Sequence, residues 1–352
     1  MAHYNCIEPC NRVEEDHSTL NNAETIPASI LTSRTPTALR VTDSYSAPVR
    51  ILMFDTRRNL FAHSLIVLAV FFDTGKSAGQ ATPLRIGLIT PAYSAAASSI
   101  DRGVRLGAFE AKQTATLFGG DVLLIEEKSV GNPDQAAERL LSRGKVQILI
   151  GSSAKDADAL SRFAESHQVI FFNVASRAPA LRAACRRYTF HVEAGDSMYA
   201  IASGGGASAA NTLLWAGTLE RYGASQINNR FRARYQTPMD GGAWAGWVAV
   251  KIAAEAALRA HSVKAGAILS YLETPSTTFD GHKGWPLSFR SWDHQLRQPL
   301  YVASRASSAG GPAFRDVPQL NTMAGGNGGD TNAGQALDVL MPKSAPRCRW
   351  AR

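Results

Sequence analysis

The sequence predicts an α/β protein built on a parallel, doubly wound β-sheet, and two observations support that prediction. Between Leu84 and Ser176, short apolar runs alternate with longer segments of helical periodicity. The short runs are nearly continuous in hydrophobic residues, as expected of strands that are covered on both faces of a sheet. Strands and helices that alternate in this way form parallel sheets, because each helix returns the chain to the same edge.

Each expected strand is a run of apolar, often β-branched residues, and each expected helix has apolar residues at helical spacing. The strand runs are LRIGLIT (84–90), DVLLIEEKS (121–129), VQILIGSS (146–153), VIFFNVAS (169–176) and the brief YTFHV (188–192). The helical segments between them are 99–120, 132–144 and 154–168. The second segment begins with Asn132 and Pro133 and ends at Gly144. These residue types are preferred at the start and just past the end of a helix.

After this region the alternation stops, and the sequence predicts mainly helices, at 212–235, 243–260 and 263–274. Residues 201–210 are rich in Gly, Ala and Ser, and we expect a flexible connection there. One stripe of the second helix is apolar and should pack in the core. Its members are Trp244, Trp247, Val248, Ile252 and Ala256. The runs PLSF (286–289) and PLYVAS (299–304) should pair as strands across a turn near Asp293.

The segment 57–81 has the order of an export signal. Two arginines precede an apolar run at 60–72, and small residues follow it. The apolar run is too short to cross a hydrocarbon layer of ~30 Å as a helix. Met53 stands just before the arginines, so we expect translation to start there, a signal peptide at 53–82, and a periplasmic protein. The alternative is a buried core helix.

This interpretation divides the chain into four parts. They are a disordered upstream extension at 1–52, the signal peptide at 53–82, a folded domain at 83–305 and a loose tail at 306–352. Within the domain, 83–200 and 211–305 are joined by the linker 201–210. The extension has two cysteines but lacks the second pair that a zinc site needs. The tail is rich in Gly, Asn, Ala and Ser.

The formal net charge of +8 at pH 7 raises the question of a nucleic-acid partner. The arginines are spread along the chain, and no basic run interleaved with aromatic residues appears. A soluble exported protein with a diffuse positive surface explains the charge better. We therefore expect no nucleic-acid partner.

Small polar residues follow the expected strands at their carboxyl ends, where parallel α/β sheets bind ligands. TPAYS follows the first strand, GSSAKD ends the third and NVASRA ends the fourth. Hydroxyl groups and free backbone amides at helix entrances favour an anion such as a carboxylate. The candidate ligand-binding residues are Ser152, Ser153, Ala175 and Ser176, with Tyr93 as a lid. The alternative is that these serines only cap helices.

Sequence motifs for catalysis, cofactors and metals are weak. LIGSSAKD is not a G-x-S-x-G elbow, no G-x-G-x-x-G follows the first strand, and the histidines lack the spacing of metal ligands. We therefore expect no enzymatic activity, no cofactor and no metal site. The alternative is an α/β hydrolase-like enzyme that uses an exposed serine.

Cys185 and Cys348 are the only cysteines that follow the signal peptide. Two cysteines in an oxidising compartment usually pair. We therefore predict a disulfide between Cys185 and Cys348, which would attach the tail to the domain.

Several segments resemble the type 1 periplasmic binding proteins of ABC importers, in the branched-chain amino acid group. The resemblance lies in LRIGLITP, GKVQILIGSSAKDADALSRFAESHQVIFFNVAS and FRARYQTPMDGGAWAGWVAVKIAAEAAL, and covers about 84–200 and 211–305. The later run LETPSTTFDGHKGWPLSFRSWDHQLRQPLYVASR is similar to the subgroup that accompanies pyrroloquinoline-quinone (PQQ)-dependent alcohol dehydrogenase systems.

The resemblance implies a non-enzymatic binding component with an ABC permease as its partner and an amino acid or small carboxylate as its ligand. In this family two lobes close on the ligand, and the first-lobe contacts correspond to Ser152, Ser153, Ala175 and Ser176. Here the chain passes through 201–210 almost directly to the helices of the first lobe, so the second lobe is expected to be truncated. We then expect the serines on an open surface and weak binding, because a cleft buries most of its ligand.

Overall fold

The computed structural model describes residues 82–92, 97–204, 211–303, 314–317, 333–343, 345 and 347–350. All of them lie in one compact unit, Phe71–Arg352. The expected extension at 1–52 and nearly all of the expected signal peptide at 53–82 lie outside the described residues. None of the helices in the described part is long and apolar enough to span a bilayer.

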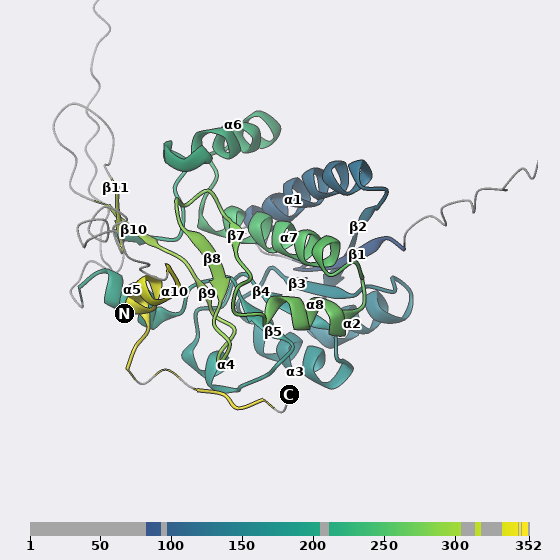
Figure 1. The fold of residues 1–352 in the computed structure, drawn as a ribbon. Coiled ribbons are helices and arrows are strands. Elements are labelled where there is room, and N and C mark those ends of the chain that lie inside the picture. The colour runs from purple at the N-terminus through teal and green to yellow at the C-terminus, as the bar shows by residue number, and fades with distance from the viewer. Residues whose placement is uncertain are drawn as a thin grey trace, which may run out of the picture. The chain divides into compact units, whose positions relative to one another are not determined.

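The predicted parallel sheet is confirmed, and it has five strands in the order β2-β1-β3-β4-β5 (Figure 1). The strands are β1 (Leu84–Pro91), β2 (Val122–Ser129), β3 (Ile148–Gly151), β4 (Ile170–Asn173) and β5 (Thr189–His191). Each neighbouring pair is parallel, with β1 between β2 and β3. The strand YTFHV therefore completes the sheet at its edge.

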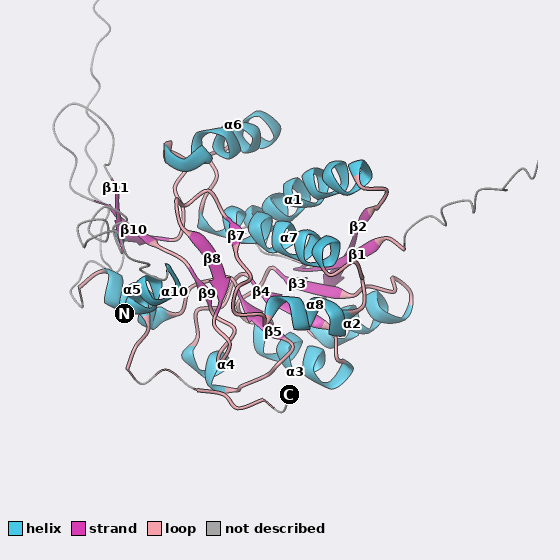
Figure 2. Cartoon of the chain, in the orientation of Figure 1, coloured by secondary structure: helices cyan, strands magenta, loops and turns pink. Residues whose placement is uncertain are grey.

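Helices cover both faces of this sheet, as a doubly wound fold requires (Figure 2). One layer contains α1 (Ala97–Leu117), α7 (Gly241–Arg259) and α8 (Ala265–Leu272), and the other contains α2 (Pro133–Ser142) and α3 (Ala157–His167). Strand β3 shows the two faces, since Ile148 and Ile150 join one hydrophobic cluster and Leu149 joins the other. Continuous apolar strands follow from this two-sided burial.

Helix ends agree with the residues that the sequence places there. Helix α2 begins after Asn132, whose side chain accepts a hydrogen bond from the Asp134 N–H at 2.9 Å. Helix α7 begins after Asp240, which accepts from the Ala243 N–H at 2.8 Å. The predicted apolar stripe of α7, from Trp244 to Ala256, is buried.

Beyond the parallel sheet, short strands form two small antiparallel sheets. One has the order β11-β10-β6 and the other β7-β8-β9. Their bounds are β6 (Thr212–Leu213), β7 (Phe279–Asp280), β8 (Pro286–Phe289), β9 (Leu296–Arg297), β10 (Leu300–Ala303) and β11 (Phe314–Val317). The helices near them are α4 (Pro179–Ala183), α5 (Asp196–Ala202), η2 (Arg221–Gly223), α6 (Ala224–Tyr235), α10 (Ala333–Leu337) and η3 (Asp338–Leu340).

Three expectations for this later region are corrected. The helix expected at 212–235 begins only at Ala224, because Gly223 has a φ of 82° and residues 212–213 pair with β10. PLSF pairs with Leu296–Arg297, whereas PLYVAS pairs with β6 and β11. The linker expected at 201–210 begins as the end of α5, and 205–210 lie outside the described residues.

The tail expected to be loose at 306–352 contains β11, α10 and η3. It also contains Cys348, which forms a disulfide with Cys185 across a Cα–Cα distance of 5.4 Å. The pairing is the one predicted from the sequence, and it holds the last described residues against the domain. Trp350 adds to this attachment, since its indole N–H donates to the Cys185 carbonyl at 2.9 Å.

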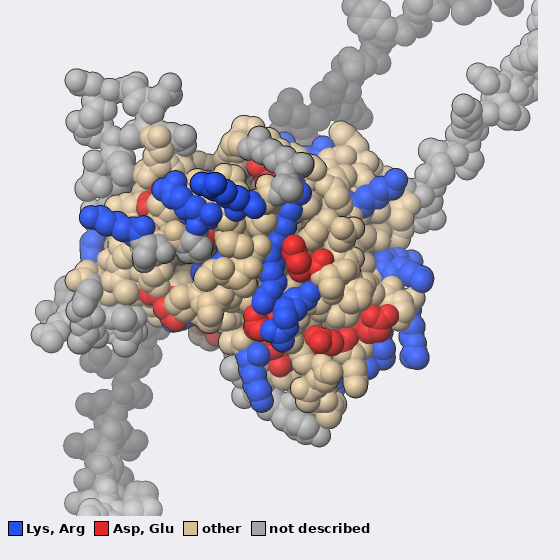
Figure 3. All heavy atoms as spheres, turned by 90° about the horizontal axis from the view of Figure 1, so that it is seen from below, with Lys and Arg blue, Asp and Glu red and all other residues tan. Residues whose placement is uncertain are grey.

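Basic side chains do not form one continuous patch on the face drawn in Figure 3. Lys and Arg stand there in several separate groups, with Asp and Glu between them. This distribution agrees with a diffuse positive charge on that face.

Candidate functional site

The strand order places a topological switch point between β1 and β3, because the chain continues to β2 on one side and to β4 on the other. In open α/β sheets of this order, ligands bind outside the carboxyl ends of the strands at that point. Ser152 and Ser153 follow β3, and Ala175 and Ser176 follow the neighbouring strand β4. The fold therefore brings all four candidate residues to one edge, whereas Tyr93 lies outside the described residues.

The expectation that Ser152 and Ser176 lie on an open surface is wrong. Ser152 is 4% exposed and Ser176 is 5% exposed. Ser152 continues the ladder between β3 and β1, since its N–H donates to the Ile89 carbonyl at 3.0 Å and its hydroxyl approaches the same oxygen at 3.3 Å. This serine is thus held by the sheet itself.

The backbone amides after β4 are also engaged. The Asn173 side chain accepts hydrogen bonds from the N–H groups of Ser176 at 2.8 Å and Ala175 at 3.4 Å. Its amide nitrogen donates to the Ser176 carbonyl at 2.8 Å. The amides that were expected to be free therefore close a turn, and only Ser153 and Ala175 of the four residues are partly exposed. The Ser176 hydroxyl accepts from the Ala178 N–H at 3.4 Å, in the turn before α4. Ala178 is the N-cap of that helix and has no side-chain cap bond, so Ser176 does not cap the helix.

A buried carboxylate that the sequence reasoning missed lies beside Ser152. Asp101, in the first turns of α1, is 8% exposed, and its Oδ1 has no hydrogen-bond partner among the described residues. Burial raises the pKa of the Asp101 carboxyl, and a hydrogen bond with the Ser152 side chain offsets only part of that effect. A group that can accept a hydrogen bond or an ammonium thus stands at the switch point.

A second missed group is Arg177, directly after Ser176. Its guanidinium lies 3.8 Å from the centre of the Tyr199 ring, and its Nε lies 3.5 Å from the Glu193 carboxylate. Glu193 is buried and also accepts from the Tyr199 hydroxyl at 2.7 Å. Because the Arg177 side chain is 48% exposed, its remaining donors can reach a ligand at the edge. Proximity of Arg177 to Ser176 in the sequence was the signal available for it.

The described residues give little support to catalysis or metal binding. They contain no group of three or more His, Cys, Asp or Glu that would hold a metal ion. A serine and a histidine meet at Ser166 and His167, 2.9 Å apart, but both lie at the end of α3, which precedes β4 and so faces the opposite edge of the sheet. A nucleophile would need a base at the carboxyl edge.

Residues 83–213 match the family model described as periplasmic binding protein. No curated protein matches the chain by sequence.

Solved structures of solute-binding proteins match the fold. They include the leucine-binding protein LivK from Thermotoga maritima, with a TM-score of 0.52 and 13% identity over 66% of this chain and 97% of that chain. Another is LivJ from Streptococcus pneumoniae, a branched-chain amino acid transporter substrate-binding protein in complex with isoleucine. Its TM-score is 0.54 and its identity is 14%, over 66% of this chain and 100% of that chain. A third is an ABC-transporter solute-binding protein from R. palustris in complex with benzoate. Its TM-score is 0.55 and its identity is 14%, over 67% of this chain and 96% of that chain.

At these identities the structural similarity shows a shared fold and not a shared ligand. The family match ends at residue 213, so it covers the parallel sheet and not α7. The strand order, the two helical layers and these comparisons agree. The described residues have the α/β fold of type 1 periplasmic binding proteins.

Proposed function

We propose that this chain is the solute-binding component of an ABC importer and that it binds an amino acid at the carboxyl edge of its parallel sheet. The observation that supports this most is that a carboxyl group and a guanidinium both lie at the carboxyl edge of the sheet in a type 1 fold. Asp101 lies beside Ser152 after β3, and Arg177 follows Ser176 after the adjacent strand β4.

The two charges suggest a zwitterion in preference to a simple carboxylate. Asp101 would accept the ligand ammonium, and Arg177 would donate to its carboxylate. Ser153 and Ala175, the partly exposed candidates, would contact the ligand directly. Ser152 and Ser176 would hold the edge in shape, and Tyr93 would close over the ligand.

The wider biological setting is part of the same proposal. The motifs shared with the subgroup of PQQ-dependent alcohol dehydrogenase systems suggest that this importer serves such a system. The export-like segment at 53–82 suggests a periplasmic location, and a membrane permease would then be the partner. Mass spectrometry of exported protein checks this, with a mature N-terminus expected between Gly79 and Thr82.

The affinity of the site is expected to be weak. The described residues form one five-stranded parallel sheet, and their other strands form small antiparallel sheets of three. A ligand at the edge would then be covered from one side only. A two-lobed cleft buries most of the ligand surface, so a single lobe should bind the ligand more weakly. We propose that the second lobe is truncated and that dissociation constants lie above the micromolar range.

Calorimetry with three ligands of matched shape tests the ligand class. Leucine carries both charges, 4-methylpentanoate carries only the carboxylate, and isopentylamine carries only the ammonium. We expect leucine to bind about tenfold more tightly than either analogue. Asp101→Asn should remove the preference over 4-methylpentanoate, because it deletes the partner of the ammonium. Arg177→Gln should remove the preference over isopentylamine, because it deletes the partner of the carboxylate.

Arg162→Gln is the matched control, since Arg162 pairs with Asp158 on the exposed side of α3 and lies away from the site. Equal binding of leucine and 4-methylpentanoate would show that the amino acid class is wrong. Failure of every amino acid and carboxylate to bind would overturn the binding function. Micromolar or tighter leucine binding would instead contradict the truncated second lobe.

A further inference from the structure

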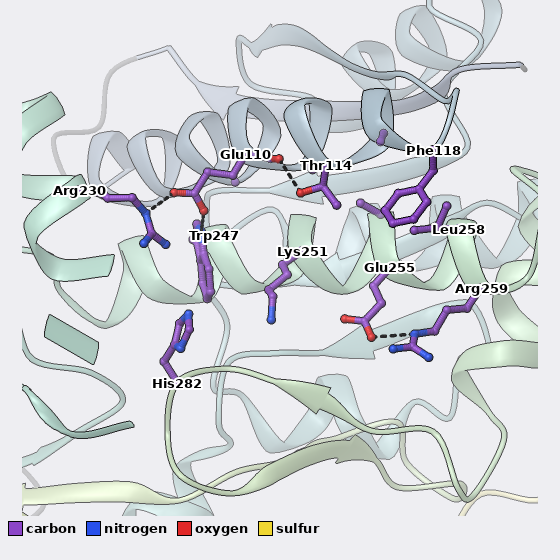
Figure 4. Close-up of a pocket in the computed structure, with 14 residues that line it drawn as sticks. Glu110, Thr114, Phe118, Arg230, Trp247, Lys251, Glu255, Leu258, Arg259 and His282 are labelled. Carbon is purple, nitrogen blue, oxygen red and sulfur yellow. Dashed lines mark hydrogen bonds and ion pairs between the residues drawn. The ribbon is translucent and has the colours of Figure 1, made fainter. Parts of the chain in front are cut away.

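A groove runs between α1 and α7 on the outside of the fold (Figure 4). Near their first turns the two helices approach closely, because a Cβ added to Gly103 would lie 1.9 Å from the Ala243 carbonyl oxygen. A Cβ added to Gly107 would lie 2.8 Å from the Trp247 carbonyl oxygen. Further along, alanines face one another across a wider space, which leaves a hollow of about 600 Å³. This volume lies within the usual range of small-molecule sites, roughly 300–1,000 Å³.

The wall of this groove is mostly apolar. Its small side chains are Ala111 and Ala115 on α1 and Ala254 on α7. Phe118 and Leu258 close its far end, and they are 66% and 37% exposed. Together with the alanines they form one exposed apolar surface, the kind of surface that can bind an apolar ligand.

Both carboxylates in the wall already have cationic or N–H partners (Figure 4). Glu110 accepts from the Arg230 guanidinium at 2.7 Å and from the Trp247 indole at 2.8 Å. Glu255 accepts from Arg259 at 2.9 Å, one turn further along α7. A ligand cation would therefore compete with existing partners at both acidic positions.

The groove wall has three cationic side chains, Arg230, Lys251 and Arg259. Lys251 is less fully paired than the two arginines. Its ammonium donates to the Asp280 carbonyl at 2.6 Å, and the Asp280 carboxylate lies 3.9 Å away and is 64% exposed. An ammonium has three N–H donors, so this group can still donate to a ligand. Arg230 and Arg259 each have a wall carboxylate at hydrogen-bond distance. Lys251 differs, because its nearest carboxylate, that of Asp280, lies 3.9 Å away and is not part of the groove wall.

We propose that the groove between α1 and α7 is a second ligand site, for a monocarboxylate with an apolar body. The apolar part would lie along the alanines between Trp247 and Phe118, and the carboxylate would meet Lys251. Residues at the carboxyl edge of the sheet take no part in it. A test of this groove is therefore independent of amino acid binding at Asp101 and Arg177.

Calorimetry with octanoate and octylamine tests the proposal, because the two probes share a chain and differ in charge. We expect octanoate to bind at least about tenfold more tightly than octylamine. Lys251→Met should weaken octanoate about tenfold, since it keeps the side-chain length and removes the ammonium. Thr114→Trp should abolish binding, because Thr114 lines the groove and is exposed, so a larger side chain fills the hollow without entering the core.

Lys112→Met is the matched control, because Lys112 is exposed on α1, pairs with Asp121 and does not line the groove. It should leave octanoate affinity unchanged. Equal binding of the two probes would overturn the charge argument, and octanoate binding that survives Thr114→Trp would overturn the location. Self-association that Thr114→Trp abolishes, without octanoate binding to the monomer, would show that the groove joins two copies instead.

Discussion

Two regions of this molecule are held together in different ways. In the parallel sheet and its helices, apolar residues of neighbouring segments pack into two continuous clusters. In the region of the small sheets, polar groups connect segments that are far apart in the sequence. Lys283, fully buried, donates to the carbonyls of Leu214 and Pro299 and to the Gln298 side chain, at 2.8–3.1 Å.

The difference shows what each region depends on. A packed apolar cluster tolerates the loss of one contact with a graded cost, whereas a buried polar group that loses a partner leaves an unmet hydrogen bond. In the second region, the Asp338 carboxylate accepts hydrogen bonds from the Nε–H groups of Arg290 and Arg297, each at 2.9 Å. Leu287, Leu300 and other residues of the small sheets also join the larger apolar cluster of the parallel sheet. In this region, specific polar side chains and one disulfide thus act in addition to apolar packing.

The largest expected effect is loss of the disulfide. Cys348→Ser opens a loop of 163 residues, and the chain-entropy model assigns about 4–5 kcal/mol to such a closure. We expect urea unfolding to show a loss of that order and hydrogen exchange to show lost protection near Trp350 first. Cys185→Ser should match it, and the double variant should add nothing. Early loss of protection in β1–β4 would contradict the separation of the two regions.

The contrast between regions also explains what the sequence predicted. Strands β1–β5 and helices α1–α3 have their signals within the segment itself, as apolar runs, caps and terminal glycines. Strand β6 has only two residues, and its partner in β10 lies almost ninety residues along the chain. A pairing between such distant short segments has no local signal, so residues 212–213 resembled the start of a helix.

The candidate site was predicted in position but not in detail. The carboxyl edge follows from the strand order, and the four small residues do meet there. Their burial depends on Asn173, whose side chain closes the turn at Ser176, and on Ile89 of a neighbouring strand. Arg177 follows Ser176 directly in the sequence. Asp101 belongs to a helix outside the strand ends, so only the folded structure relates it to the site.

An intermediate effect is expected at the contact between α1 and α7, which tests the packing of the first region. Gly103→Ala places a methyl group against the Ala243 backbone and should cost about 3 kcal/mol. Gly266→Ala is the same change in α8, where no atom lies within 4 Å of the added methyl. It should stabilise by about 0.5–1 kcal/mol, because alanine favours the helix. Equal stability of the two variants in urea would show that the close approach is absent.

The smallest expected effect concerns Glu273, whose carboxylate ties α8 to the second region. Arg187 donates to it at 2.7 and 2.8 Å, and the His294 Nε2 lies 3.4 Å from it. Burial opposes ionisation, but the hydrogen bonds from Arg187 and the nearby His294 side chain prevail and lower the pKa of Glu273 to about 2 from its ordinary 4.5.

The sign of the pH effect follows from this lowered pKa. A carboxyl group with a lower pKa in the folded state stabilises the protein above its ordinary pKa, and this contribution disappears as the pH falls through the folded value. Glu273→Gln should therefore cost about 1 kcal/mol at pH 7, and the cost should shrink between about pH 4.5 and pH 2. Glu220→Gln provides an exposed control, with no change expected. Urea unfolding of both variants across this range measures the difference, and a cost that stays constant down to pH 2 would show that the ion pair does not form.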